Sequence, residues 1–189
     1  DSDHAGGALA VQRGFSVARV VGGDVPGLPE QLRAQPCVSG ETWEWDGVRF
    51  SLWRWPGASD SNQKSCVLQV QANDERLLLT GDIDAHAERD FVRSPLAVPT
   101  QWLQAPHHGS RTSSSMVLLK ALAPDRVLIS RGHGNAYGHP HPQVIARYKA
   151  LGVQVLDSAE QGAIRFRLGG FGEAQGMRDQ WRFWRSSPG

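Results

Sequence analysis

Two turn signals near the middle of the chain constrain its fold more than any other feature. Asp46-Gly47 separates residues 42–45 from residues 48–55, and apolar residues alternate with polar ones on both sides of it. A second turn, at Asn73-Asp74, joins segments 66–71 and 76–80. Asp-Gly between alternating apolar residues is a strong signal for a tight antiparallel hairpin. The sequence therefore predicts two consecutive β-hairpins.

Helices and strands alternate after the hairpins. Helical patterns are expected at 84–93, 113–122 and 141–151, and short apolar strands at 101–105, 126–130, 153–156 and 163–168. Ser113 can cap the second of these helices, and Pro142 suits the first turn of the third. A short helix at 5–13, a buried strand at 16–21 and a helical turn at 30–33 are expected before the hairpins. This order predicts an α/β (α+β) fold with a mixed sheet, or with two sheets and helices outside them.

Length, composition and charge limit the class of protein. The chain has 189 residues, of which 40% are apolar and 21% charged, and this suits one globular domain. The sequence contains no apolar run long enough for a membrane span and no signal peptide pattern. A net charge of +1 excludes a protein that holds DNA mainly by bulk positive charge. The first residue is not Met, and we expect that either the natural protein continues upstream or a segment was removed.

The chain has two cysteines, Cys37 and Cys66, and their spacing is not that of a zinc site. They can form a disulfide in an oxidising compartment, or they can remain two buried thiols. The sequence leaves both alternatives open, and we favour the thiols.

Three glycine-flanked loops carry side chains that bind metals. Asp82 follows the apolar run 77–81, His107 and His108 follow a short strand, and segment 1–4 reads Asp-Ser-Asp-His. Loops at the ends of strands are where functional sites are built. Each loop alone has an ordinary explanation, as a turn, a surface pair or an acidic terminus. Together they predict a metal site and a metallohydrolase.

A fourth loop, residues 130–141, holds three histidines and three glycines after a predicted buried strand. Such a loop can lie over a site and offer imidazole, amide and backbone donors to an anion. The alternative is a loop that enters a helix and exposes its histidines to solvent.

Taken together, these segments resemble the metallo-β-lactamase superfamily, whose motif is His-x-His-x-Asp-His, then a bridging Asp, then a later His. Within it, they are similar to the C-terminal domain of the ComEC family of competence DNA-uptake channel proteins. The matching segments are 1–7, 62–65, 77–83, 107–110, 135–141 and 162–166. The resemblance implies an αββα sandwich over residues 1–168, lacking its first strands, and leaves residues 169–189 as a C-terminal extension.

The resemblance also implies the metal ligands. Asp3 and His4 match the Asp-His of the motif, Asp82 matches the bridging Asp, and His108 matches the last His ligand. Asp1 stands where the superfamily has its second His, and it is a further candidate ligand. The motif's first His would stand before Asp1, and its middle His has no clear match. One metal site is therefore expected to be complete and the other poor, with one or two ions of zinc or manganese.

Catalytic roles follow from the same resemblance. Asp3 and Asp82 are expected to act in the reaction as well as to bind metal. His107 lies beside a ligand, and His139 matches a histidine that the superfamily places near the substrate. These imidazoles can neutralise charge on a phosphate in a water-poor site.

The resemblance implies a metal-dependent phosphodiesterase that degrades DNA through a metal-activated water. Its expected partners are single-stranded DNA and the rest of a membrane channel protein for natural transformation. The expected location is a soluble periplasmic domain of an inner-membrane protein. For this chain alone we expect little or no turnover.

Two alternatives remain. The first is a metallohydrolase of the same fold that acts on another substrate, such as a phosphorylcholine ester or a lactone. The second is a non-catalytic DNA-binding or docking domain. The Arg- and Trp-rich tail would then contact phosphates and stack on bases, although a buried amphipathic tail is the simpler interpretation.

Overall fold

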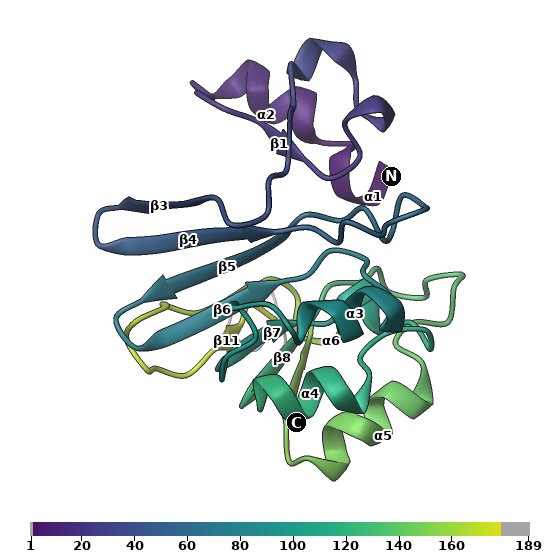
Figure 1. The fold of residues 1–189 in the computed structure, drawn as a ribbon. Coiled ribbons are helices and arrows are strands. Elements are labelled where there is room, and N and C mark those ends of the chain that lie inside the picture. The colour runs from purple at the N-terminus through teal and green to yellow at the C-terminus, as the bar shows by residue number, and fades with distance from the viewer. Residues whose placement is uncertain (1, 179–189) are drawn as a thin grey trace, which may run out of the picture.

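A seven-stranded mixed sheet forms the centre of this computed structural model, which describes residues 2–178. The strands lie side by side in chain order (Figure 1): β3 Thr42–Trp45, β4 Val48–Trp53, β5 Val67–Ala72, β6 Glu75–Leu79, β7 Trp102–Gln104, β8 Arg126–Ile129 and β9 Gln154–Asp157. The ladders from β3 to β6 are antiparallel, and those from β6 to β9 are parallel. The predicted mixed sheet is confirmed.

Both hairpins form where the turn signals predicted them. Asp46 and Gly47 have φ values of 50° and 76°, and Asn73 has a φ of 52°. Positive φ in the turn matches the right-handed twist of the two strands, and Asn, Asp and Gly tolerate it best. These turns therefore set the register of the antiparallel half of the sheet.

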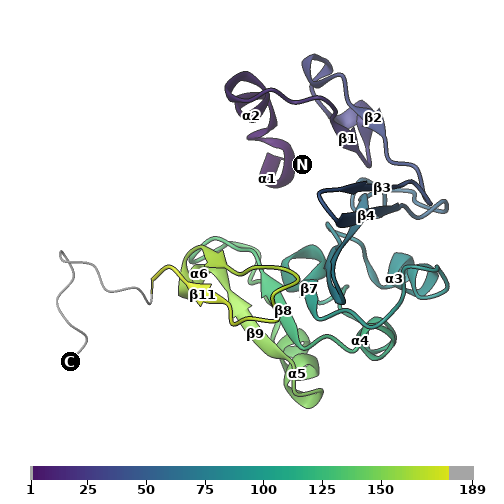
Figure 2. The same cartoon turned by 90° about the vertical axis from the view of Figure 1, so that its left-hand side faces the viewer.

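Three helices cover one face of the sheet (Figures 1 and 2): α3 Ala85–Phe91, α4 Met116–Leu122 and α5 Pro142–Ala150. Leu78, Leu103 and Val127 are register partners on neighbouring strands and point to this face. The helix side chains packed against them are fully buried: Phe91, Leu118, Leu119, Leu122, Val144 and Tyr148. Burial of this apolar area is the main force that holds strands and helices together.

The cap of α4 differs from the prediction. Ser115 caps the helix by accepting a hydrogen bond from the Leu118 N–H, whereas Ser113 was expected to do so. The Ser113 hydroxyl instead donates to the carbonyl oxygens of Pro106 and Ser110, at 2.6 and 2.9 Å. Ser113 therefore closes the loop that precedes the helix.

Residues 2–36 form a smaller unit, called here the N-terminal unit, which lies above β3 and β4 in Figure 1. Its elements are α1 Ser2–Ala5, α2 Ala8–Gly14, β1 Val21–Gly22, η1 Val25–Gly27, η2 Glu30–Leu32 and β2 Gln35–Pro36. β1 and β2 pair in parallel through two residues each. The predicted buried strand at 16–21 is wrong for most of its length, because residues 16–20 belong to no strand and Val17 is exposed.

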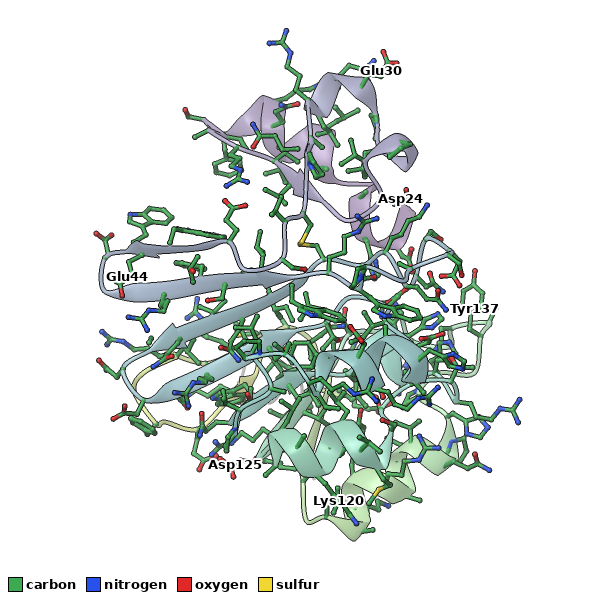
Figure 3. The ribbon with its side chains drawn as sticks, viewed as in Figure 1. Asp24, Glu30, Glu44, Lys120, Asp125 and Tyr137 are labelled. Atoms are coloured by element: carbon green, nitrogen blue, oxygen red, sulfur yellow. A yellow bond between two sulfur atoms is a disulfide. The ribbon has the colours of Figure 1, made fainter. Side chains whose placement is uncertain are left out.

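A disulfide between Cys37 and Cys66 joins the end of the N-terminal unit to the start of β5. Figure 3 shows its sulfur–sulfur bond between that unit and the sheet. Our preference for two free thiols was therefore wrong, because the fold brings the two Cα atoms to 5.8 Å. An ion pair between Lys64 and Asp24, 3.2 Å from nitrogen to oxygen, lies close to it in the sequence.

Past β9 the chain returns to the sheet through α6 Ser158–Gln161 and the antiparallel pair β10 Ile164–Arg165 and β11 Gln175–Gly176. Phe166 stacks on Trp102 with ring centroids 4.0 Å apart. The carboxylate of Glu75, which is 1% exposed, accepts hydrogen bonds from Trp102 Nε1 and from the Gly169 N–H, both 2.6 Å long. Residues 169–178 therefore contact the sheet, and a boundary at 168 stays a prediction.

The Arg- and Trp-rich part of the tail, residues 179–189, lies outside the described residues. Among residues 2–178, none of the helices has both the length and the apolar character that a bilayer span requires.

Candidate metal centre

Two of the predicted ligand loops leave neighbouring parallel strands at the same edge of the sheet. Asp82 follows β6, and His107 and His108 follow β7. Gln104, at the end of β7, ties the loops together. Its Oε1 accepts hydrogen bonds from the N–H groups of Thr80 and Gly81, at 2.9 and 3.1 Å. The strand order therefore brings an acidic and an imidazole loop to one place.

The histidine loop has an unusual backbone. His107, His108 and Gly109 have φ values of 50°, 53° and 82°, all in the left-handed region. Residues with a side chain adopt this region rarely, and such strain is concentrated at functional sites. A Cβ atom at position 109 would lie 2.7 Å from the Cβ of Pro140, so only glycine fits there. The loop is thus held in a conformation that turns both imidazoles toward Asp82.

The segment predicted as the third loop is the short helix α1, and it brings Asp3 and His4 to the same place. His4 Nε2 lies 3.3 Å from Asp82 Oδ1, and His108 Nε2 lies 3.4 Å from Asp3 Oδ2 and 3.6 Å from Asp82 Oδ1. The two Nε2 atoms are 3.3 Å apart. One ligand atom from each of the four residues lies within 4.8 Å of all the others. Segments about a hundred residues apart in the sequence therefore form one cluster.

The chemistry of this cluster fits a cation. His108 Nδ1 lies 2.7 Å from the carbonyl oxygen of Ser130, so Nδ1 carries the proton of the neutral ring and donates it there. The lone pair of His108 Nε2 then points at carboxylate oxygens. Asp82 Oδ1 is buried and has no hydrogen-bond partner, although His4 Nε2 is close to it. His108 Nε2 and Asp82 Oδ1 are then two acceptors 3.6 Å apart, and such a pair repels unless a cation lies between them.

The pKa shifts of Asp3 and His139 also suit a cation at the cluster. For Asp3, burial raises the pKa of the carboxyl, but hydrogen bonding to its own backbone and the charges of His4 and His108 outweigh that effect and lower it overall. For His139, burial and then the charges of His107 and His108 lower the pKa of the ring. At neutral pH Asp3 is therefore ionised and His139 is neutral.

The other predicted site residues lie around the cluster or outside the described part. His107 Nε2 is 3.9 Å from Asp82 Oδ2, and the His139 ring lies 5.7 Å from the His107 ring, centroid to centroid. Asp1 lies outside the described residues. His141 caps α5 by accepting from the Gln143 N–H, as the helix-entry alternative for its loop predicted. The metal-binding and catalytic roles remain predictions.

Sequence reasoning missed the residues that orient the ligands. The Ser65 hydroxyl accepts a hydrogen bond from the Asp82 N–H at 3.0 Å, Gln104 holds the turn before Asp82, and Ser130 orients His108 through its backbone carbonyl. Ser65 belongs to a segment that matched the superfamily, and this was the available signal. Gln104 and Ser130 gave none, because a strand-end amide and a backbone carbonyl have no distinctive pattern.

A cavity of about 590 Å³ opens beside the cluster. Its walls are the N-terminal unit on one side, and Asp82 with the loop before β5 on the other. Glycines line much of it: Gly6, Gly22, Gly23, Gly27 and Gly81. The cluster therefore borders a hollow rather than a closed core.

Comparison with known proteins identifies the class. The family model of the metallo-beta-lactamase superfamily matches residues 1–133. The chain belongs to this superfamily, and the predicted α/β fold class is confirmed. Among the described residues, one large sheet and two short strand pairs form the β-structure, rather than two sheets of similar size.

Particular relatives narrow the comparison. Over the whole length of this chain, its sequence is 39% identical to "Competence protein ComA" of Neisseria gonorrhoeae. It is 43% identical to "Uncharacterized protein YcaI" of Escherichia coli over 76% of the chain, and 32% identical to "Recombination protein 2" of Haemophilus influenzae over 87%. The chain spans only 27%, 19% and 21% of these relatives. The predicted resemblance to competence proteins is confirmed.

Proposed function

We propose that the chain is a metal-dependent phosphodiesterase domain that cuts DNA and belongs to a protein of DNA uptake. The observation that carries the proposal is the cluster of Asp3, His4, Asp82 and His108, in which acceptor atoms face one another. The membership in the metallo-beta-lactamase superfamily and the similarity to a competence protein support it.

The four residues would hold a divalent cation through two carboxylates and two imidazoles. Zinc accepts this set, and the two oxygen donors also suit manganese. Such an ion supplies a strong nucleophile at neutral pH by lowering the pKa of water. The carbonyl of Ser130 keeps His108 Nε2 free for binding, and Ser65 fixes the backbone of Asp82.

Two imidazoles beside the cluster would contact a bound phosphate. His107 borders Asp82, and His139 borders His107. Because His139 is neutral at pH 7, its ring can donate a hydrogen bond to a phosphate oxygen or accept a proton from the attacking water. These roles require a phosphate bound on the His107 side of the cluster.

We further propose that the domain works outside the cytoplasm, on the periplasmic side of a channel in the inner membrane. The Cys37–Cys66 disulfide supports this placement, because such bonds persist in oxidising compartments. A test is to count free thiols in protein recovered from the periplasm and from the cytoplasm of the same cells. Two free thiols in the periplasmic protein would contradict the placement.

The test of the activity is cleavage of labelled single-stranded DNA with added manganese or zinc. Asp82→Ala should lower the rate at least about a hundredfold, since losing a direct ligand costs more than losing a group that orients one. Asp125→Ala is the matched control, because Asp125 is exposed and precedes β8, whereas the ligand loops follow the ends of the parallel strands β6 and β7. Figure 3 labels Asp125. Little or no turnover is expected of this chain alone, so both proteins are compared as chains extended upstream. Equal rates for the Asp82 variant and the unmodified protein would refute the proposal.

The assay should include a chain extended upstream, because the first and middle histidines of the superfamily motif have no counterpart in the printed sequence. A panel with a lactone and a phosphorylcholine ester separates the proposed function from other hydrolases of the same fold. Faster turnover of either compound than of DNA would favour that alternative.

A further inference from the structure

A row of aromatic rings runs from the candidate metal centre to the solvent. His107 borders Asp82, and His139 borders His107 with ring centroids 5.7 Å apart. Tyr137 ends the row, with its ring 6.0 Å from the His139 ring at an interplanar angle of 23°. Tyr137 is 83% exposed, the largest exposure among the large apolar side chains of the described residues. An aromatic face is therefore presented to solvent two rings away from the cluster.

The backbone around this row is fixed by hydrogen bonds. Asn135 Nδ2 donates to the His139 carbonyl at 2.7 Å, and Asn135 Oδ1 accepts from the His139 N–H at 3.0 Å. The His141 N–H donates to the Gly109 carbonyl at 2.9 Å, which joins this loop to the histidine loop. Tyr137 is thus carried on a loop that is anchored beside the ligands, and its place relative to His107 is defined.

From this placement we propose that Tyr137 forms a subsite that stacks the nucleobase of the nucleotide next to the phosphate at the cluster. This inference rests on the proposed function and adds a substrate class to it. The face of an aromatic ring binds any base by stacking, and bases of single strands offer their faces freely. In a duplex the faces are covered by neighbouring pairs. The subsite therefore selects single-stranded DNA over duplex DNA and over substrates that lack a base.

The matched control comes from a second exposed aromatic residue. Trp45 is 69% exposed and lies on the β3–β4 hairpin, next to Glu44. Figure 3 shows Glu44 and Tyr137 on opposite sides of the molecule. Loss of stacking at Trp45 should leave binding at the cluster unchanged.

The experiment measures binding of a fluorescent thymidine oligonucleotide and of an abasic oligonucleotide of the same length. Both have a cleavage-resistant phosphorothioate backbone, and manganese is added, so that the cation stays in place and neither strand is cut. The unmodified chain should bind the thymidine strand more tightly than the abasic strand. Tyr137→Ala should weaken binding of the thymidine strand about tenfold and leave the abasic strand unchanged, whereas Tyr137→Phe should restore most of the difference. Trp45→Ala should bind both strands as the unmodified chain does.

Three results would overturn the inference. They are equal binding of both strands by the unmodified chain, unchanged thymidine binding by Tyr137→Ala, and an equal loss in Tyr137→Ala and Trp45→Ala. Because binding is read without turnover, these results are separate from the cleavage assay with Asp82→Ala. A chain extended upstream that stacks bases but cuts no DNA would keep the subsite and refute the proposed activity.

Discussion

The N-terminal unit and the sheet with its helices each supply two of the four clustered side chains, yet they are built very differently. Helix α2 has no buried residue, and β1 and β2 pair through two residues each. In the seven-stranded sheet with its helices, called here the body, α3 buries Ala87, Glu88 and Phe91 against a continuous apolar core. Asp82 and His108 are thus fixed by packing, whereas Asp3 and His4 stand on a thinly packed part.

Asp82 and His108 are therefore held by more contacts than Asp3 and His4 are. Ser65, Gln104 and Ser130 hold the body's two ligands through hydrogen bonds. The N-terminal unit is tied to the body by a covalent bond and by few other contacts, among them the Lys64–Asp24 ion pair. Local stability in proteins follows the number of such contacts. Three sets of substitutions test this difference between the two parts of the molecule.

The largest effect is expected at the disulfide. Replacing Cys37 and Cys66 with serine should lower the free energy of unfolding by about 3–4 kcal/mol, because a long loop in the unfolded chain is no longer closed. Amide hydrogen exchange should quicken more in residues 2–36 than in β6 to β8. Urea unfolding and exchange measured on the same samples provide the check. Unmodified protein treated with a dithiol reductant is the control, and equal loss of protection in both regions would contradict the comparison.

A smaller effect is expected when one ligand from each region is removed. Asp82 has a side chain that is 6% exposed, and Asp3 has one that is 56% exposed. Water can replace the Asp3 carboxylate more easily, so Asp82→Asn should weaken zinc binding by more than about a hundredfold and Asp3→Asn by about tenfold. Competition with a chelating dye measures both, with Asp125→Asn as control. The reverse order would show that the N-terminal unit dominates the centre.

The smallest effect concerns the cap of α3 in the body. Asp84 accepts from the N–H groups of His86 and Ala87, and Asp84→Ala should cost about 1 kcal/mol. Burial raises the pKa of Asp84, but hydrogen bonds from Ala87, Gln63 and His86 outweigh it and lower the pKa below 3.8.

The lowered pKa fixes the direction of the pH dependence. The stabilisation by Asp84 is fully present above pH 3.8 and disappears as the pH falls through the lower value of the folded state. Thermal unfolding of Asp84→Ala, compared with Asp84→Asn as control between pH 7 and strongly acidic pH, provides the measurement. A constant difference at all pH values would contradict this origin.

Local patterns predicted the antiparallel half of the sheet and the order of helices and strands in the rest. Asp46-Gly47 and Asn73-Asp74 specify turns that depend only on neighbouring residues. Three loops rich in metal-binding side chains predicted a metal site, and the resemblance then selected its ligands. These are Asp3, His4, Asp82 and His108, and no local rule places side chains a hundred residues apart together. The superfamily motifs thus indicated which distant residues lie together, and local sequence patterns cannot do this.

The wrong predictions share one physical cause: each of these local structures depends on residues that are distant in the sequence. Residues 16–20 have the composition of a buried strand, but among the described residues of this segment only Val21 and Gly22 pair with another strand. Serine often caps helices, but the Ser113 hydroxyl donates to two carbonyl oxygens of the preceding loop. The pairing of Cys37 with Cys66 depends on how the N-terminal unit docks.

Gln104 joins both ligand loops of the body through one amide group, and no atom of it belongs to the cluster. Its Nε2 also donates to the carbonyl of Ala105, two residues before His107. In a survey of every single substitution, position 104 would consequently score beside the ligands, with metal lost while the protein stays folded. The loss of metal binding on substitution would then follow the number of ligand loops that a residue holds in place, and the residue's distance from the metal would matter less.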